Sequence, residues 1–171
     1  MAICLDGTPA AADAVTGPRH PEMCSCAAAA HFCLVAQAHP AVVPHARRSA
    51  RHTLAAWRLD QIADDTELVV SELLTNAVQA TLATPTVPSA LRAAPPMVAL
   101  YLTLDPDLLS VLVWDNSPEP PAQRPYASNE DETGRGLVIV QALSDQWGIC
   151  APPGGGKVVW AQLSAPSPGH R

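Results

Sequence analysis

The stretch LVVSELLTNAVQAT, residues 68–81, is apolar on almost every side and yet keeps one line of polar side chains. At about 100° per residue, Glu72, Asn76 and Gln79 fall within a stripe of one helix face roughly 60° wide. An exposed helix normally carries a wider polar face than this. The narrow line therefore indicates a helix face that looks into a pocket, and a surface stripe with an i,i+4 pair is the alternative.

The residue types in this line suit a metal-dependent reaction. A carboxylate and an amide one helical turn apart, as Glu72 and Asn76 would be, can hold a hydrated Mg²⁺ and position an attacking hydroxyl. Two other short motifs carry comparable chemistry. In VWDNSP, Asp115 ends an apolar strand, where it can close an Asx turn or accept a hydrogen bond from an exocyclic amine. In TGRGL, residues 133–137, glycines open a helix whose free backbone N–H groups suit a phosphate.

The elements around these motifs predict an α+β fold. Helical spacing covers residues 41–59, 60–83 and 134–146, and strand patterns cover 31–37, 97–104, 108–115, 147–151 and 157–163. The order is helices, then strands, then a helix and strands again. This order predicts a two-layer α/β sandwich, with helices on one face of a mixed, mostly antiparallel sheet.

Composition limits the classes of function. The chain has 171 residues and a formal net charge of −6, and no basic cluster is large enough to displace counterions from nucleic acid. No apolar run approaches the length that crosses a bilayer, and the first residues do not resemble a secretory signal. The odd count of five cysteines favours reduced thiols in a cytoplasm.

We expect a single folded domain with two short flanks. Residues 1–30 are rich in Ala, Pro and Cys without clear periodicity, which predicts a weakly ordered extension. The folded domain covers residues 31–164, and residues 165–171 form a tail. Zinc binding by Cys24, Cys26, His31 and Cys33 is disfavoured, because the C-x-C spacing is tighter than the usual zinc pattern.

In chain order the motifs resemble those of one known superfamily. The segments SELLTNAVQAT, VWDNSPEPP, GRGLVIVQALSDQWG and GGGKVVWAQL are similar to the motifs of GHKL (Bergerat-fold) ATPases in sequence and approximate spacing. Within that superfamily, the chain is most similar to the stand-alone anti-sigma-factor serine kinase-like ATP-binding proteins of actinobacteria. The resemblance covers roughly residues 31–164.

The resemblance implies binding of ATP with Mg²⁺, and a role for each motif. Glu72 would be the general base, Asn76 would hold Mg²⁺ against the phosphates, and Asp115 would accept the adenine amino group. Residues 116–133 would form a lid over the nucleotide. Phosphate would be cradled by the backbone of Gly134, Arg135, Gly136 and Leu137.

Two functions remain open from the sequence. The first is a serine/threonine protein kinase that passes the γ-phosphate of ATP to a hydroxyl of a partner protein. The resemblance implies a sigma factor or an anti-sigma-factor antagonist as that partner, and hence a role in transcription regulation. The second is a nucleotide-dependent protein-binding switch with little or no catalysis. A homodimer is compatible with either function, and neither involves direct contact with nucleic acid or a membrane.

Three departures from the superfamily pattern bear on this choice. Ser117 stands where the D-x-G-x-G motif has its first glycine. Ala80 stands where many relatives carry His or Tyr, and Val158 where relatives often carry Thr near the adenine carboxylate. These changes leave nucleotide binding intact as a prediction and make catalysis the open question. The neighbouring Lys157 is expected to be a surface residue at the start of a strand.

Overall fold

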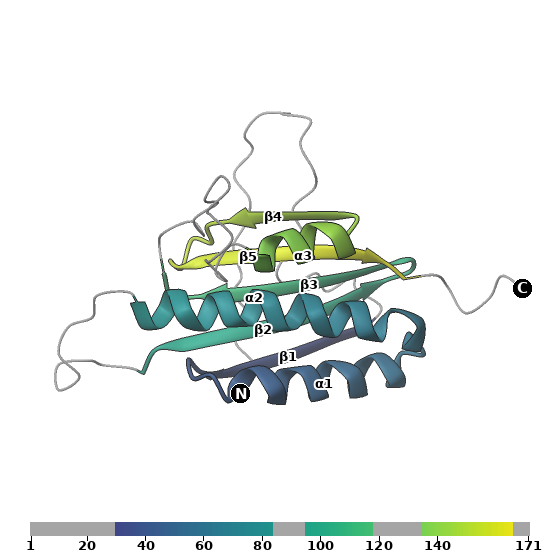
Figure 1. Cartoon of the computed structure of the whole chain (residues 1–171), viewed down its shortest axis with the longest axis horizontal. Helices are drawn as coiled ribbons and strands as arrows, with labels where there is room; N and C mark the ends of the chain where they lie inside the picture. The colour runs from purple at the N-terminus through teal and green to yellow at the C-terminus, as the bar shows by residue number, and fades with distance from the viewer. Residues whose placement is uncertain (1–29, 84–94, 118–134, 166–171) are drawn as a thin grey trace, which may run out of the picture.

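The sheet is built from two strand pairs and one N-terminal edge strand. A computed structural model describes residues 30–83, 95–117 and 135–165 (Figure 1). In chain order the elements are β1 (Ala30–Gln37), α1 (Val42–Ala56), the short 3₁₀ helix η1 (Asp60–Ile62), α2 (Ala63–Ala83), β2 (Met97–Asp105), β3 (Leu108–Asp115), α3 (Arg135–Leu143), β4 (Gln146–Cys150) and β5 (Lys157–Ser164). The predicted elements are all present, with bounds that shift by a few residues.

The five strands form one sheet in the order β1-β2-β3-β5-β4. Every pair of neighbours is antiparallel, whereas the sequence suggested a mixed sheet. The β2–β3 and β4–β5 pairs are consecutive strands joined by short turns, which makes them antiparallel. The β1–β2 and β3–β5 connections contain helices and are long enough for either direction, so local sequence does not fix those two pairs. The predicted two-layer α+β architecture is otherwise confirmed.

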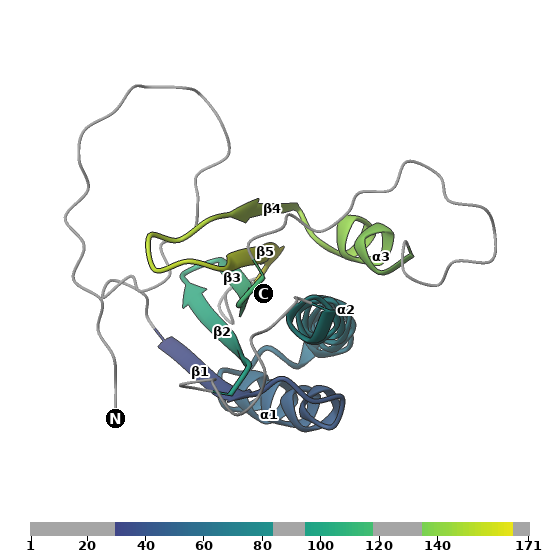
Figure 2. The same ribbon diagram turned by 90° about the vertical axis from the view of Figure 1, so that its left-hand side faces the viewer.

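All three α-helices lie on the same face of the sheet (Figure 2). The period of two in each strand explains this arrangement, because alternate side chains of a strand point to opposite faces. In β3, Val111 and Val113 face the helices and belong to the main core, whereas Leu112 belongs to a second buried cluster. Fully burying one such aliphatic side chain contributes about 1.5–3 kcal/mol, so this face holds the helices in place.

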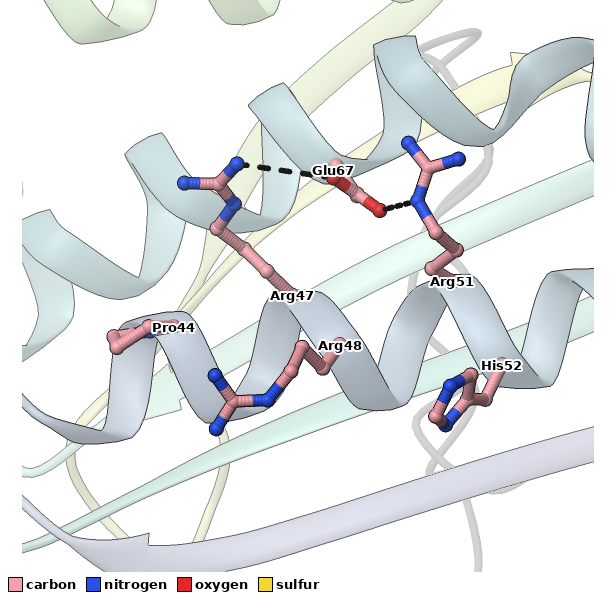
Figure 3. A pocket seen from close by; sticks show the side chains of 6 residues that line it. All are labelled: Pro44, Arg47, Arg48, Arg51, His52 and Glu67. Carbon is pink, nitrogen blue, oxygen red and sulfur yellow. Dashed lines mark hydrogen bonds and ion pairs between the residues drawn. The ribbon is translucent and has the colours of Figure 1, made fainter.

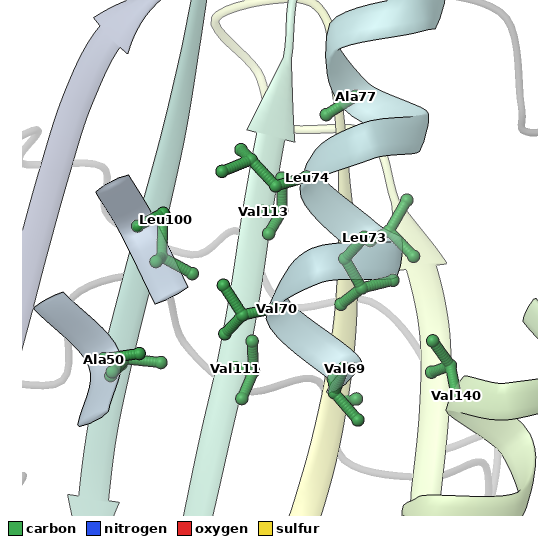
Figure 4. Close-up of a cluster of buried hydrophobic side chains, with 14 of the residues drawn as sticks. Ala50, Val69, Val70, Leu73, Leu74, Ala77, Leu100, Val111, Val113 and Val140 are labelled. Carbon is green, nitrogen blue, oxygen red and sulfur yellow. The ribbon is translucent and has the colours of Figure 1, made fainter. Parts of the chain in front are cut away.

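Helix α2 lies at the centre of the helical layer. It buries a run of apolar side chains, among them Val70, Leu74 and Ala77, against the sheet (Figure 4). In Figure 4, α2 and β3 run in the same direction, with Val70 near Val111 and Ala77 beyond Leu74 along the helix. The second half of α2 therefore lies toward the end of β3 that carries the candidate carboxylate.

Ion pairs tie α1 to the start of α2. Arg51 pairs with Asp64. Arg51 also pairs with Glu67, and the guanidinium of Arg47 lies 3.8 Å from the Glu67 carboxylate (Figure 3). A hollow of about 350 Å³ opens beside these groups. It is lined by Pro44, Arg47, Arg48, Arg51, His52 and Glu67. Exposed pairs of this kind contribute little to stability because solvent screens them, and none of these residues belongs to the candidate site.

Several predicted segments fall outside the described residues. These are all but the last residue of the N-terminal extension, all but the first residue of the tail, and all but the first two residues of the predicted lid. Within the ranges that the structure describes, no helix is both long enough and apolar enough to cross a membrane.

Candidate functional site

The polar line of α2 divides into an enclosed part and an open part. Glu72 and Asn76 are partly buried, and their neighbours Leu73 and Ala77 are fully buried against the sheet. Gln79, the third member of the line, is exposed. The helix therefore presents two polar side chains, one turn apart, at the edge of the core. The surface-stripe alternative accounts for Gln79 but not for the other two.

Helix α3 begins directly against this polar pair. A Cβ atom placed on Gly136 would lie 2.5 Å from Oε2 of Glu72 and 3.6 Å from Nδ2 of Asn76. Real Cβ atoms do not approach an oxygen as closely as 2.5 Å, so only glycine allows this contact without movement of the Glu72 carboxylate. The G-x-G and E-x-x-x-N motifs, about 60 residues apart in the sequence, thus meet in the fold.

The first turn of α3 brings backbone donors to the same place. Its first residues are Arg135, Gly136 and Leu137, and N–H groups in the first turn of a helix have no acceptor within the helix. These groups form the positive end of the helix dipole, and no acidic side chain lies in that turn. Leu137 packs its side chain on the core, so its backbone is the part available to a ligand. Gly134 and the side chain of Arg135 lie outside the described part.

Asp115 ends β3 as a buried carboxylate whose two oxygens differ. The residue is 1 % exposed. Its Oδ1 accepts a hydrogen bond from the backbone N–H of Ser117 at 2.8 Å and another from Nζ of Lys157 at 2.8 Å. Its Oδ2 is buried and has no hydrogen-bond partner. The Asx turn suggested by the sequence is therefore present on one oxygen, and the other oxygen remains an unsatisfied acceptor.

A buried acceptor without a hydrogen bond destabilises the protein, so a ligand that donates a hydrogen bond to it is favoured. Burial raises the pKa of Asp115 above its usual value, and the hydrogen bonds from Lys157 and Ser117 act in the opposite direction. Leaving such a group unpaired costs about 1–3 kcal/mol, and more when it is charged. A ligand that offers an N–H to Oδ2 would remove this cost. Oδ2 is thus a free acceptor for a ligand N–H group.

Lys157 is the site residue that the sequence reading missed. It was expected at the surface, yet it is 4 % exposed and pairs with Asp115 directly across β3 and β5. The alternation of β5 was the available signal, because Val159 and Ala161 face the core and Lys157 shares their face. Val158 points to the opposite face, into the second cluster, so its lack of a hydroxyl cannot affect Asp115.

The loss of the family glycine at Ser117 has a smaller effect than the sequence suggested. Ser117 contributes its backbone N–H to Asp115, and this donor does not depend on the side chain. Residue Ser117 is itself buried, so the turn after β3 is held against the body of the protein. The carboxylate is therefore fixed in spite of this departure.

The β4–β5 turn packs against the same strand end. Gly155 and Gly156 both have positive φ, 86° and 76°. The carbonyl of Gly155 accepts a hydrogen bond of 3.1 Å from the Trp114 indole N–H. A Cβ on Gly156 would lie 2.2 Å from the backbone oxygen of Asp115. The turn thus supports the backbone that carries the candidate carboxylate.

Three consecutive glycines in this turn give a graded stability prediction. Gly154→Ala should change the free energy of unfolding by less than about 0.5 kcal/mol, because a Cβ there meets nothing within 4 Å. Gly155→Ala should cost about 1–2 kcal/mol, since its φ is positive but its surroundings are open. Gly156→Ala should cost more than about 3 kcal/mol, because the Asp115 backbone blocks the Cβ as well. Denaturant unfolding of the three variants checks the order, and equal losses at Gly155 and Gly156 would contradict the predicted contact.

A metal cluster made by the protein alone is not found in the described ranges. They contain no group of three or more His, Cys, Asp or Glu side chains that could hold a metal ion. Cys24 and Cys26, two members of the disfavoured zinc set, lie outside those ranges. Any Mg²⁺ at this site would therefore need ligands from a bound molecule in addition to Asn76.

Comparison with known proteins agrees with the fold. Residues 36–163 match the family model of the histidine kinase-like ATPase domain, which covers most of the chain. The protein therefore belongs to the histidine kinase-like ATPase domain family, a class of ATP-binding domains. No curated protein matches the chain. The superfamily that the motifs resemble is thus confirmed.

Proposed function

We propose that this protein is an ATP-dependent serine/threonine protein kinase of the anti-sigma-factor type. The observation that carries the proposal is the approach of Gly136 to Glu72 and Asn76. Because of this approach, a carboxylate, an amide and the positive end of a helix lie close enough together to contact the same ligand group. A phosphate chain with a bound cation matches that combination of charges, because it is anionic toward the helix and cationic toward the amide oxygen.

Each residue has a distinct part in this proposal. Oδ2 of Asp115 accepts the amino group of adenine, and the backbone N–H groups at the start of α3 bind the phosphates. The amide oxygen of Asn76 would hold a Mg²⁺ that offsets the charge of those phosphates. These assignments use the acceptor that the fold leaves unpaired and the donors that a helix start leaves free.

Glu72 has the position and chemistry of a general base. Bound Mg-ATP supplies the phosphoryl group and the charge that stabilises its transfer. Glu72 removes the proton from a partner hydroxyl while that oxygen bonds to the γ-phosphorus. The bond between the γ-phosphorus and the bridging oxygen breaks in the same step, and ADP leaves. Asn76 and the first turn of α3 hold the reacting groups in line.

A nucleotide-dependent binding switch is the second candidate. Ala80 supports it, because this position of α2 offers a methyl group where many relatives carry His or Tyr. A switch would need Asp115, Asn76 and the helix start but would not need Glu72. The two candidates therefore differ at a single side chain.

The partner is proposed to be a sigma factor or an anti-sigma-factor antagonist in the cytoplasm. Affinity capture from a lysate with Mg-ATP or with Mg-ADP, followed by mapping of phosphorylated residues, tests this. A captured protein that carries a new phosphoserine or phosphothreonine only with ATP supports the kinase. Capture that depends on the nucleotide without any phosphorylation supports the switch, and absence of ATP binding would remove both.

Gly136→Ala should separate catalysis from folding. The added methyl group would displace the Glu72 carboxylate, the mobile end of a side chain, so the fold should survive. Stability should stay equal or rise by up to about 1 kcal/mol, because Ala is the better helix former. Phosphoryl transfer should fall at least tenfold, since a general base must lie within hydrogen-bonding reach of its proton. Val138→Ala, on the exposed side of α3, is the matched control and should keep full activity.

A further inference from the structure

We propose that Lys157 makes the site selective for 6-amino purines over 6-oxo purines. It does so by fixing Asp115 as an ionised carboxylate whose one open oxygen can only accept a hydrogen bond. This inference rests on the proposed function, because it concerns the base of the nucleotide that the site binds. Lys157 acts through Asp115 and is therefore a positioning residue.

The hydrogen bonds of Asp115 are unevenly divided. Lys157 Nζ and the Ser117 N–H both donate a hydrogen bond to Oδ1, so the same oxygen accepts both. Oδ2 receives none and is buried. The pair cannot be a solvated surface contact, because the side chains of Lys157 and Asp115 are 5 % and 1 % exposed. The ammonium thus sets which oxygen remains open to a ligand.

The protonation state of Oδ2 decides which base it can bind. An ionised carboxylate only accepts hydrogen bonds, so it pairs with the N–H of a 6-amino group and opposes the oxygen of a 6-oxo group. A protonated carboxyl can donate, so it can pair with that 6-oxo oxygen. Base selectivity is therefore coupled to the charge of Asp115.

Among the residues that the structure describes, Lys157 is the charged group that acts on Asp115. The partner of Asp115 on β2 is Val98, and α2 turns Leu74, Ala77 and other apolar side chains toward the sheet. The α2 carboxylate of Glu72 lies instead against Gly136. Lys157 is the only charged side chain in this part of the chain that lowers the pKa of Asp115, while burial raises it.

Removal of the ammonium should consequently make Asp115 titrate at higher pH. Without Lys157, burial acts with only the Ser117 N–H against it, so the pKa of Asp115 rises further. The ionised form, which binds the 6-amino group, then persists only above that raised pKa. As pH falls through it, ATP affinity should fall and affinity for a 6-oxo nucleotide should rise.

The test compares ATP with inosine triphosphate, which carries the 6-oxo group in place of the 6-amino group. Calorimetry of the full chain with each Mg-nucleotide is run from about pH 6 to about pH 8. We expect the parent to prefer ATP by at least tenfold at every pH, the scale of one charge-assisted hydrogen bond. Lys157→Met should reduce the preference for ATP at least tenfold near pH 6, and the preference should return as the pH approaches 8. Protonation of the phosphates affects both nucleotides alike and cancels in the ratio.

Two further variants serve as controls. Asp115→Asn combined with Lys157→Met removes both charges, so the ratio of affinities should no longer change with pH. Lys157→Arg keeps the positive charge and should keep the preference for ATP. If Lys157→Met does not fold, Lys157→Gln replaces it, because it also removes the charge but keeps a polar side chain, and it should show the same loss of ATP preference as the pH falls.

The outcomes separate this inference from the proposed function. A parent that binds neither nucleotide would overturn the proposed function and this inference with it. A parent that binds ATP, with the same preference and the same flat pH profile after Lys157→Met, would overturn the role of Lys157 alone. A pH-dependent ratio that persists in the double variant would assign the titration to another group and would also overturn it.

Discussion

Glu72→Gln lowers phosphoryl transfer to the captured partner by about 10²–10⁴-fold and leaves ATP affinity within a few-fold of the parent. The substitution is nearly isosteric and preserves the contact with Gly136, so the fold and the phosphate site should persist. A base that accepts its proton only as the phosphoryl group moves contributes little to binding of the ground state. Calorimetry and transfer of labelled phosphate measure the two quantities separately.

Asn76→Ala, on the same helix, should differ from Glu72→Gln because it should lower nucleotide affinity itself. Loss of the amide oxygen should weaken nucleotide binding in the presence of Mg²⁺ and have little effect in its absence. Gln79→Ala is the matched control, because Gln79 follows on the same stripe of α2 and is exposed. Parent values for both affinity and transfer in Glu72→Gln would refute the kinase and leave the switch as the function.

Asp115→Asn should weaken ATP binding by about tenfold to a hundredfold, the range of one charge-assisted hydrogen bond. The acceptor Oδ2 is buried without a partner in the fold, so its hydrogen bond to a bound base is not offset by the loss of an existing bond. Replacement by an amide removes the negative charge and leaves Lys157 without its counter-ion. Thermal unfolding must accompany the titration, because breaking a buried pair can cost about 3–5 kcal/mol.

Asp105→Asn is the control for this experiment. Asp105 is also a carboxylate at the end of a strand, but β2 runs antiparallel to β3, so it lies at the other end of the sheet. It should leave ATP affinity unchanged. Equal ATP affinity for the parent and for a folded Asp115→Asn variant would remove Asp115 from the base site.

Much of the fold could be predicted because its local signals agree with its tertiary arrangement. The alternation in residues 97–104 and 108–115 and the turn around Pro106 predicted the β2–β3 hairpin almost to the residue. Helical spacing likewise predicted a helix over residues 60–83, where the structure has η1 and α2. The directions of the β1–β2 and β3–β5 pairs could not be predicted in this way, since pairing between strands distant in the sequence leaves no local pattern.

The candidate site was predictable in its motifs and not in its contacts. Glu72, Asn76 and Asp115 were found because their residue types conflict with their apolar surroundings. Lys157 was missed because a lysine at a strand start is usually solvated, and its burial depends on a partner 42 positions away in the sequence. The approach of Gly136 to Glu72 depends equally on how α3 packs against α2.

The ion pair between Asp115 and Lys157 has a consequence for how this lineage can diverge. Losing either charge alone leaves its buried partner unpaired, at a cost of about 3–5 kcal/mol. That is a large share of the 5–15 kcal/mol by which a typical domain is stable. Descendants should therefore keep both residues or exchange both together. A change of nucleotide preference that leaves stability intact thus requires two coordinated substitutions, and it should arise more slowly than a single-site change.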